Sequence, residues 1–410
     1  MITRIEIDGF KSLREFAVDL EPLTVFIGPN SAGKSNILDA LALMSRLASM
    51  PIDDAFKQGR GRAIDQFTRR GGQAGTTIRF AVEVIVPSEE GKSNAPVLSP
   101  NRYRYELIID RGALASGAER LTVSHEQWRF IEESEDGWLV SHPALAGRVL
   151  HHVGGRATNT QAARIARERN HVRSAHTALA STLQDVEARD QLSSYRLVHL
   201  DSARLREPSE RIGSDTLDPD ASNLPTVLAN LPGPTLGEIR ADLVSLVPGV
   251  SSFEIVPDGD SFRIDFEFSG GERLPARLVS DGTLRILALL TALRVEPRSA
   301  MIGVEEPENG VYPGRLRKLV EFMQEIAEQD REDGGSPTQL VLTTHSPVVL
   351  AALRSRPELL RFVDLVRRDG QLATRARTVS PTPGPDRGQL SISPREIDDL
   401  LHAADSEFGQ

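Results

Sequence analysis

The sequence of 410 residues contains no cysteine. Disulfide bonds, thiolate metal sites and cysteine nucleophiles are therefore excluded. Long apolar runs are missing too: the longest spans residues 286–293 and includes a threonine, far short of the roughly 20 residues that cross a bilayer. The amino-terminal stretch carries charged side chains at positions 4, 6, 8 and 11, which the apolar core of a signal peptide does not. We expect a soluble, cytoplasmic protein with no membrane partner.

An excess of positive charge is also absent. The 58 acidic and 48 basic residues give a formal net charge of -10, so nucleic acid would have to bind a local basic patch against an unfavourable overall field. Four arginines gather within one Ala- and Gln-rich stretch, at positions 164, 167, 169 and 173. No aromatic residues are interleaved with them and acidic residues lie nearby, which favours a solvated helix face. A small patch for nucleic acid or an acidic partner is the alternative.

The first half of the chain alternates between strand and helix signals. Residues 2–7, 15–20 and 23–27 are expected strands, and residues 34–50 have helical apolar spacing. Residues 77–86, 102–110 and 119–125 predict an antiparallel β block. Residues 160–195 are rich in helix formers and predict helices. Residues 206–234 are rich in turn-forming residues and predict a connection with one short helix at 226–231.

From about residue 236 the pattern becomes helix, hairpin, helix, strand, helix, strand, helix. The hairpin spans 252–268 and turns at 258–260, and a long helix is expected at 284–295. Apolar strands at 300–305 and 339–344, each followed by a helix, indicate a parallel α/β layer. The tail from 376 is expected to be loose until a short helix after residue 394.

The motif G-P-N-S-A-G-K-S at residues 28–35 fits G-x-x-x-x-G-K-[ST] and has a strand before it and a helix after it. Such a loop brings successive backbone N–H groups to an anion at a helix N-terminus. Lys34 is expected to reach the β- and γ-phosphates of ATP, and the Ser35 hydroxyl to bind Mg²⁺. The alternative, an ordinary glycine-rich turn, is disfavoured by the flanking elements. The expected nucleotide-binding residues here are Gly28, Asn30, Ser31, Ala32, Gly33, Lys34, Ser35 and Asn36.

The segment M-I-G-V-E-E-P-E-N-G at residues 301–310 delivers two carboxylates at the end of an apolar strand, where ligands bind in open α/β sheets. We assign Glu305 to the metal ion and Glu306 to the attacking water. The alternative is an acidic loop ahead of a helix, since acids favour that end. In a chain that also carries a P-loop, the catalytic interpretation is preferred.

A third motif, T-T-H-S-P at residues 343–347, follows another buried strand. His345 is expected beside the γ-phosphate as a hydrogen-bonding catalytic residue. Ser346 and Pro347 also suit a helix N-terminus, and the two interpretations are compatible.

A fourth motif, S-D-G-T at residues 280–283, opens a helix and suits a second anion site. The expected nucleotide contacts are Ser280, Asp281 and Gly282. The chain already has one phosphate-binding loop. We therefore expect the loop at 280–283 to close over the nucleotide of another subunit. The letters S-G-G-E-R at 269–273 look similar, but a proline at 275 follows where a helix should run, so a hairpin end is expected.

Along the chain the four motifs follow the order P-loop, S-D-G-T-L-R, E-E-P-E-N and T-T-H-S. This order resembles the ABC-type ATPase heads of the SMC/RecF group, and most of all the prokaryotic AAA-type branch that includes the ATPase half of OLD-family nucleases. The resemblance covers roughly residues 1–50 and 190–370. It implies an α/β P-loop head with a mixed, partly parallel sheet, an antiparallel β subdomain and a compact helical insertion. It also implies that Ser280 and Gly282 contact the γ-phosphate of a partner copy, and that Asn309-Gly310 couple the two subunits.

The sequence departs from this pattern in two places. The metal-side carboxylate is Glu305 where many such heads have aspartate, and the signature is S-D-G-T instead of S-G-G-Q. The glutamine loop of the family has only weak candidates, Gln73 and Gln127. About 60 residues follow His345 with scattered acids only, so we expect no nuclease, which needs several converging carboxylates. No heptad run is long enough for an SMC coiled coil.

The expected division is an amino-terminal ATPase part (1–130), a helical arm (131–200), a second ATPase part (201–375) and a tail (376–410). The expected function is an ATP-driven switch that forms a homodimer or larger homo-oligomer around ATP and Mg²⁺. A role in phage defence or DNA maintenance with a separately encoded effector follows from the resemblance, and DNA binding itself has no support in the sequence. A slowly hydrolysing, nucleotide-gated scaffold is the alternative. A transporter subunit is disfavoured by the large insertion at 50–190.

Overall fold

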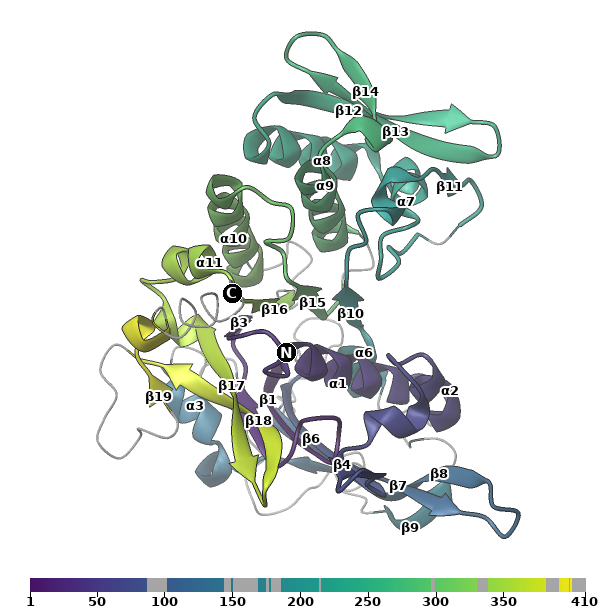
Figure 1. The fold of residues 1–410 in the computed structure, drawn as a ribbon, viewed down its shortest axis with the longest axis vertical. Helices are drawn as coiled ribbons and strands as arrows, with labels where there is room; N and C mark the ends of the chain where they lie inside the picture. Colours follow the sequence, from purple (N-terminus) through teal and green to yellow (C-terminus); the bar gives the residue numbers. More distant parts are fainter. Residues whose placement is uncertain are drawn as a thin grey trace, which may run out of the picture.

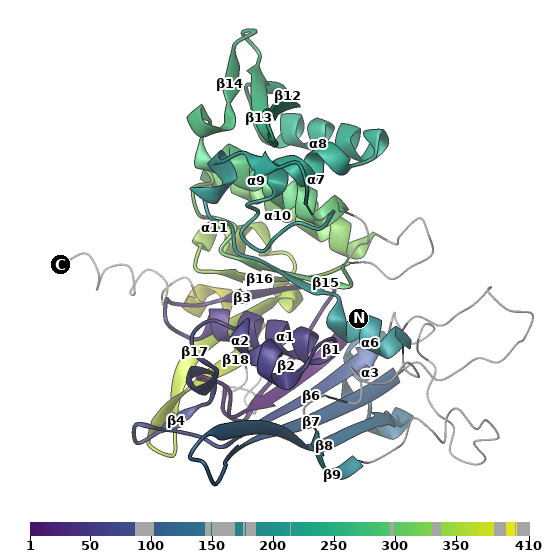
Figure 2. The same cartoon turned by 90° about the vertical axis from the view of Figure 1, so that its right-hand side faces the viewer.

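The computed structural model describes residues 1–86, 102–143, 169–174, 186–213, 215–295, 299–329, 338–380 and 391–397, with the single residues 149, 177 and 399. Its described strands form two large sheets with helix α1 (Lys34–Leu47) between them, and a third layer lies on the other side of the parallel strands (Figures 1 and 2). This layering is the α/β head with an antiparallel subdomain that the motif order predicts.

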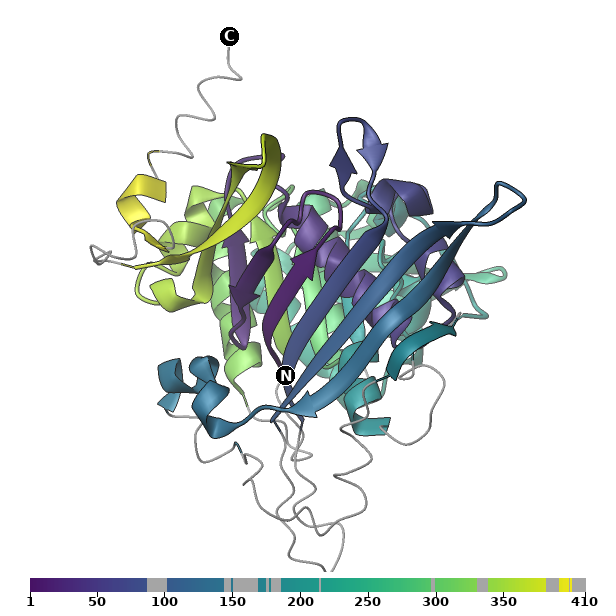
Figure 3. The same ribbon diagram turned by 90° about the horizontal axis from the view of Figure 1, so that it is seen from below.

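The antiparallel sheet has the order β2-β1-β6-β7-β8-β9. Its strands are β1 (Ile2–Asp8), β2 (Phe16–Asp19), β6 (Thr77–Ile85), β7 (Arg102–Ala113), β8 (Glu119–Phe130) and β9 (Arg169–Ser174). Polar and apolar residues alternate along β1, so Ile5 and Ile7 are buried against α1 while Arg4 and Glu6 face outwards. One face of the sheet therefore belongs to the core, and Figure 3 shows the other face uncovered by described helices.

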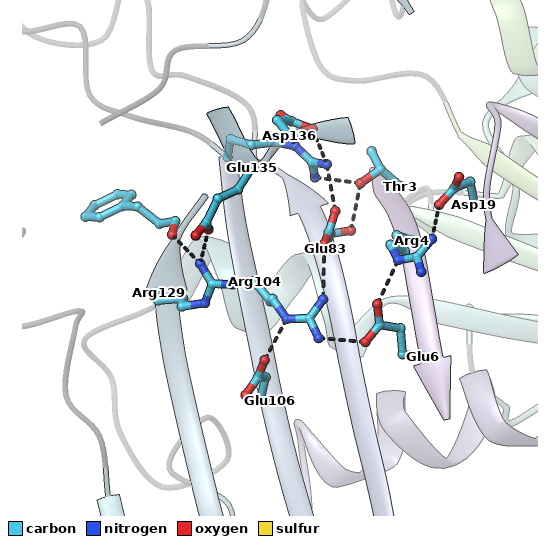
Figure 4. A network of polar contacts seen from close by, with 12 residues as sticks. Thr3, Arg4, Glu6, Asp19, Glu83, Arg104, Glu106, Arg129, Glu135 and Asp136 are labelled. Carbon is cyan, nitrogen blue, oxygen red and sulfur yellow. Dashed lines mark hydrogen bonds and ion pairs between the residues drawn. The ribbon is translucent and has the colours of Figure 1, made fainter. Parts of the chain in front are cut away.

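Opposite charges on neighbouring strands pair with one another across the outward face (Figure 4). Arg104 of β7 reaches Glu6 of β1 at 2.7 Å and Glu83 of β6 at 3.1 Å, while Arg4 reaches Asp19 at 2.7 Å. Pairs of this kind stabilise cross-strand register. The face is hollowed to about 820 Å³, and its charges are largely satisfied within the sheet.

The second sheet has the order β10-β15-β16-β3-β17-β18-β19. Its strands are β3 (Leu23–Ile27), β10 (Tyr195–Val198), β15 (Met301–Glu305), β16 (Gln339–Thr344), β17 (Leu360–Arg368), β18 (Gln371–Val379) and β19 (Ser391–Ile392). The first five in this order are parallel, and β18 is antiparallel to β17. Along β3, Val25 and Ile27 join one core and Phe26 joins the other, which explains why these strands are continuous apolar runs.

The third layer is built from residues 204–295 together with two helices that follow the parallel strands. It contains η5 (Arg204–Arg206), β11 (Ser209–Glu210), α7 (Leu224–Asn230), α8 (Gly233–Leu246), β12 (Val250–Asp258), β13 (Ser261–Phe268), β14 (Arg273–Pro275), η6 (Ala276–Leu278) and α9 (Asp281–Arg294). Helices α10 (Pro313–Glu328) and α11 (Pro347–Ala352) pack below it against the sheet (Figure 2). Helix α9 is apolar on all sides because it lies at the centre of this core.

The remaining elements are short. They are α2 (Ile52–Lys57), η1 (Ala63–Gln66), β4 (Arg69–Arg70), β5 (Gln73–Ala74), η2 (Glu133–Glu135), α3 (Gly137–Ser141), α6 (Val186–Ser193) and η7 (Pro357–Leu359). No helix in the described ranges combines the length and the apolar composition that a membrane span requires.

Two expectations about secondary structure are wrong. Residues 169–174 form strand β9 at the edge of the antiparallel sheet, because pairing with β8 outweighs the helical preference of their sequence. The tail is not loose from residue 376: β18 continues to Val379, and β19 pairs with it in parallel. Most of the remaining residues assigned to a helical arm, 144–168 and 175–185, lie outside the described ranges except for single positions.

Several other expectations are confirmed. The hairpin at 252–268 is β12 and β13, and the S-G-G-E-R segment is the turn into β14, with Gly271 at a left-handed φ of 79°. Residues 394–397 are helical, as expected after Pro394. The division of the chain at 130, 200 and 375 stays a prediction.

Candidate nucleotide site

The loop between β3 and α1 curls over the N-terminus of α1. Ser31 and Gly33 have left-handed φ angles of 64° and 96°, so the backbone turns tightly before the helix begins. Glycine at 33 is also required for space, because a Cβ there would lie 2.0 Å from Thr374 Oγ1 of β18. A tight turn of this kind before a helix is typical of phosphate-binding loops.

Lys34 is 6% exposed and lies folded back on the loop. Its Nζ donates to the carbonyl oxygens of Gly28 at 2.7 Å and Pro29 at 2.9 Å. Burial lowers the pKa of Lys34, while nearby carboxylates, Glu306 first among them, act in the opposite direction. The ammonium group is thus held beside the mouth of the loop, close to the carboxylates that the next motif supplies.

The other predicted P-loop residues have different surroundings. Asn30 and Ser31 are exposed, whereas Ala32 is buried and its carbonyl accepts from Thr374 Oγ1 at 3.0 Å. Asn36 is turned towards the amino-terminal sheet, where its Nδ2 donates to Ser12 Oγ at 2.8 Å. A nucleotide role for the Asn36 side chain would need this bond to open.

Glu305 ends strand β15 and is surrounded by cationic and hydroxyl groups. Arg60 bonds both carboxylate oxygens, at 3.3 Å for Nη1 to Oε1 and by a close Nη2 contact to Oε2, and His199 Nδ1 lies 2.7 Å from Oε2. Burial favours the neutral acid, but the bonds from Arg60 and from Ser35 outweigh it and lower the pKa of Glu305. Glu305 is therefore ionised, and the Arg60 guanidinium group is the cation paired with it.

Arg60 and His199 were not predicted from the sequence. Arg60 lies in the loop after α2 and also approaches Asp39 of α1 at 3.4 Å, and Asp39 in turn pairs with Lys11 at 2.6 Å. His199 directly follows β10, which pairs in parallel with β15. The rule that ligands bind at the carboxyl ends of parallel strands would have pointed to His199, whereas no local pattern pointed to Arg60.

Glu306 adopts a left-handed backbone conformation with φ of 47°. Its N–H donates to Thr343 O at 3.0 Å, so the peptide still pairs with β16 while the side chain turns away. Two groups lower the pKa of Glu306 to about 2. They are the His345 imidazole, whose Nδ1 lies 3.6 Å from Glu306 Oε1, and the Asn309 amide, which donates to Glu306 Oε2 at 2.9 Å. Backbone strain of this kind costs on the order of 1–3 kcal/mol and is concentrated at functional sites.

Glu308 connects the ends of β15 and β16. Its Oε1 accepts from the His345 N–H at 2.9 Å and from Thr344 Oγ1 at 2.7 Å, and lies 3.2 Å from His345 Nδ1. The nearby carboxylates raise the pKa of His345, and the closeness of Glu306 is the main cause. The structure brings His345 and both carboxylates together, and it adds Glu308, which the sequence presented only as the last acid of E-E-P-E.

Buried polar side-chain atoms that have no hydrogen-bond partner among the described residues also lie here. They are Glu308 Oε2, Thr343 Oγ1 and His345 Nδ1. Unsatisfied buried oxygens cost free energy, so a site of this kind suits a water molecule or a ligand. Among the described residues no cluster of three or more metal-ligating side chains exists. Ser35 and Glu305 nevertheless fit Mg²⁺, which protein sites bind through one or two side chains plus phosphate and water.

The residues predicted to contact a second nucleotide lie at the start of α9. Ser280 caps the helix, its Oγ accepting from Thr283 N at 3.4 Å, and Asp281 pairs with Arg206. Gly282 packs on Gly310, where an added Cβ would lie 2.4 Å from the Gly310 carbonyl oxygen. The predicted signature and the Asn309-Gly310 loop are thus in backbone contact within one chain.

In the described part of the chain, neither candidate for the glutamine loop interacts with Glu305. Gln73 is exposed in the short strand β5, and Gln127 lies in β8 opposite Glu106 on the antiparallel sheet. His199 lies beside Glu305 instead.

Comparison with known proteins places this site in a family. A profile described as "AAA domain, putative AbiEii toxin, Type IV TA system" matches residues 23–351, a range that includes all four motifs. The chain belongs to this family.

Two relatives agree with the family. The DNA replication and repair protein RecF of Renibacterium salmoninarum is 28% identical over 207 residues, which make up 50% of this chain and 51% of RecF. The chain thus spans about half the length of that curated relative. The fold is similar to the crystal structure of an SMC head bound to the C-winged helix domain of ScpA, with a TM-score of 0.52 and 15% identity, covering 92% of this chain and 97% of the SMC head. The family match and the fold agree with the α/β ATPase head that the motif order predicts.

Proposed function

We propose that this ATPase head binds and hydrolyses ATP with Mg²⁺ and works as an ATP-driven dimerisation switch. The observation that carries the proposal is the meeting of Glu305, Glu306 and His345 at the carboxyl ends of adjacent parallel strands, next to the P-loop lysine. Positioned charges of this kind are what phosphoryl transfer requires, since catalysis there is mainly orientation and electrostatic stabilisation.

Different residues of the chain would bind the phosphates and the metal ion. The backbone N–H groups of residues 30–35 and the Lys34 ammonium group would bind the phosphates, and Ser35 with Glu305 would hold Mg²⁺. The metal ion supplies charge neutralisation on the phosphate oxygens. Binding requires Arg60 to leave Glu305, because the guanidinium group now bonds both of its carboxylate oxygens.

Glu306 is the residue that would orient the attacking water. With a pKa of about 2 it is ionised at neutral pH and accepts a hydrogen bond from Asn309. His345, held by its backbone N–H on Glu308, would donate to the γ-phosphate as charge develops there. The role of Glu308 is to position His345 and Thr344 against the neighbouring strand.

The surface around the Ser280 loop supports assembly with a second copy. Leu278, two residues before Ser280, is 62% exposed, and Tyr312, two residues after Gly310, is 71% exposed. Large apolar side chains left exposed beside both loops support an interaction surface there. Because the Ser280 loop and the Asn309-Gly310 loop are already packed together, both would face the same partner.

The relatives support a proposal for the biological role. The family description names a toxin and a type IV toxin–antitoxin system, and the RecF relative is a DNA replication and repair protein. We therefore propose action in phage defence or DNA maintenance together with a separately encoded effector, in the manner of an OLD-like ATPase.

The low pKa of Glu306 favours a second candidate function. A carboxylate with a pKa of about 2 is a weak base, so it takes a proton from water poorly. A protein with such a base could hold ATP and an effector for long periods, as a nucleotide-gated scaffold that hardly turns over.

Light scattering of the wild type and of Glu306→Gln, each with and without ATP and Mg²⁺, tests the switch. Glu306→Gln should form a larger assembly only with ATP, and the wild type should form it transiently while releasing phosphate. Lys34→Ala is the control that should stay at one size. If the wild type and Glu306→Gln both assemble stably and release phosphate equally slowly, the scaffold function is supported instead. If neither changes size, ATP does not control assembly.

A further inference from the structure

The Ser280 loop, residues 276–283, carries an acid where a phosphate is expected to bind. Asp281 is the first residue of α9, and its carboxylate is 44% exposed. A carboxylate is favoured at a helix N-terminus because it interacts with the same partial positive charge that would attract a phosphate. Left unpaired, Asp281 would repel the nucleotide that this loop is proposed to contact.

Arg206 of η5 counters that charge. Its Nη2 contacts the Asp281 carboxylate, while its Nη1 donates to the carbonyl oxygens of Val279 at 2.8 Å and Arg277 at 2.9 Å. One guanidinium group therefore neutralises the acid of the loop and also anchors the backbone on the other side of Ser280. A lysine could not do both, because it lacks the planar, forked arrangement of donors.

The loop is held from two other directions as well. On one side, Gly282 is in backbone contact with Gly310. On the other, Arg285 in the first turn of α9 donates from Nε to Ser202 Oγ at 3.1 Å, which ties the helix to the segment just before Arg206. The backbone of the Ser280 loop is thus held at both ends, and the Arg206–Asp281 pair neutralises the acid of the loop, whose other charged side chain, Arg277, is exposed.

We propose that Arg206 is a positioning residue that turns the Ser280 loop into a phosphate-binding surface for the nucleotide held by a second copy of this chain. The inference rests on the proposed dimerisation switch. It assigns Arg206 to the site of the partner's nucleotide and predicts that a chain lacking Arg206 still binds its own ATP. Arg206 itself needs no contact with the phosphates, since it acts through Asp281 and the loop carbonyls.

The test uses the Glu306→Gln protein, with ATP affinity and ATP-dependent assembly measured separately. Adding Arg206→Gln should leave the affinity of the isolated chain for a fluorescent ATP analogue within about twofold and weaken assembly by tenfold or more. Arg204→Gln is the matched control, since Arg204 is exposed on the same 3₁₀ turn, and it should change neither value. Arg206→Lys should fall between the two.

Charge rescue distinguishes neutralisation of Asp281 from general support of the fold. Adding Asp281→Asn to Arg206→Gln removes the uncompensated acid and should restore most of the lost assembly. A merely structural role would not be rescued by a change that restores no contact to the carbonyls. If Arg206→Gln fails to fold, Arg206→Lys is used in its place. Arg206→Lys should weaken ATP-dependent assembly by about threefold, and adding Asp281→Asn should restore it.

A mixture of two defective proteins tests the assignment to the partner's nucleotide. Lys34→Ala keeps an intact Ser280 loop, and Arg206→Gln keeps an intact P-loop, so a mixed dimer has one complete composite site. Mixing should therefore restore ATP-dependent assembly that neither protein shows alone. If mixing does not restore assembly, Arg206 acts in the nucleotide site of its own chain and the inference is wrong.

Failure of the inference and failure of the proposed function give different results. If the Glu306→Gln parent does not assemble with ATP, the dimerisation switch is wrong. If the parent assembles and the Arg206→Gln version assembles equally well, the switch stands and the role of Arg206 is wrong.

Discussion

The Arg60 guanidinium group and the Glu305 carboxylate form a two-point contact, with Nη1 3.3 Å from Oε1 and Nη2 bonded to Oε2. Glu305 is the side chain proposed to hold Mg²⁺, and in this structure the guanidinium group of Arg60 is bonded to both of its oxygens. Asp39, which Arg60 approaches at 3.4 Å, offers this arginine a second anion. On the proposed function, we expect Arg60 to leave Glu305 when Mg²⁺ and the nucleotide bind.

Arg60→Gln should make Mg²⁺ binding easier. The arginine side chain is 41% exposed, and pairs of this exposure contribute roughly 0–1 kcal/mol, so the Mg²⁺ concentration that supports half-maximal ATP binding should fall by about two- to fivefold. The measurement is a Mg²⁺ titration of fluorescent ATP analogue binding. Arg62→Gln, which removes an exposed arginine of the same loop paired with Asp65, should leave the titration unchanged. Weaker binding in Arg60→Gln would mean that Arg60 contacts the nucleotide after it leaves Glu305.

Glu308→Ala should lower both stability and turnover. It leaves the His345 N–H and the Thr344 hydroxyl without their acceptor, at a cost of about 1–3 kcal/mol for buried donors, and frees His345 to move. Denaturant unfolding and steady-state phosphate release check the two effects. Glu308→Gln keeps one acceptor oxygen and should recover much of the stability. Glu321→Gln on the exposed face of α10 is the control. If Glu308→Ala is destabilised but releases phosphate at the normal rate, Glu308 stabilises the fold and does not act in turnover.

Asp136→Ala should destabilise the head by about 3 kcal/mol or more without changing ATP affinity. Asp136 and Arg102 are both buried, and Asp136 accepts from Arg102 Nε at 2.8 Å and from Nη2 at 3.0 Å, so the substitution removes a two-point partner and leaves the buried guanidinium group with Glu83 as its carboxylate partner, at 3.0 Å. Asp136 lies next to Glu135, which pairs with Arg129 at 2.8 Å on the surface (Figure 4). Glu135→Gln should cost less than about 1 kcal/mol. Equal losses in the two variants would show that burial of the pair is not what matters.

The His142–Glu21 pair should make stability depend on pH. Burial disfavours the charged imidazole, but the bond to Glu21, 2.6 Å from Nε2 to Oε2, raises the pKa of His142 above its usual 6.5. A group whose pKa is raised on folding stabilises the fold fully below its unfolded pKa and loses this contribution as the pH rises through the folded pKa.

Urea unfolding of the wild type and His142→Gln at pH 6 and pH 9 measures this contribution. The stability difference between the two proteins should be larger at pH 6. In a Glu21→Gln background the pH dependence of that difference should shrink, because the partner that raises the pKa is gone. A difference of the same size at both pH values would contradict the assignment.

The sequence by itself determined the elements that depend on local chemistry. The P-loop, the acidic end of β15 and the T-T-H-S segment each follow an apolar strand, and parallel strands of this kind are buried on both faces, so their apolar runs and their polar ends can be recognised without neighbours. The order of these motifs was enough to identify the ATPase head.

Only the tertiary structure decided which side chains meet at the nucleotide site from distant parts of the chain. Arg60 and His199 reach Glu305 from positions 245 and 106 residues away, through a surface loop and through the pairing of β10 with β15. Strand β9 exists because an edge of the antiparallel sheet was open to it, against the helical preference of its own residues. The pairing of Arg206 with Asp281 likewise depends on η5 packing against the start of α9, and a local sequence pattern carries no information about a contact of that kind.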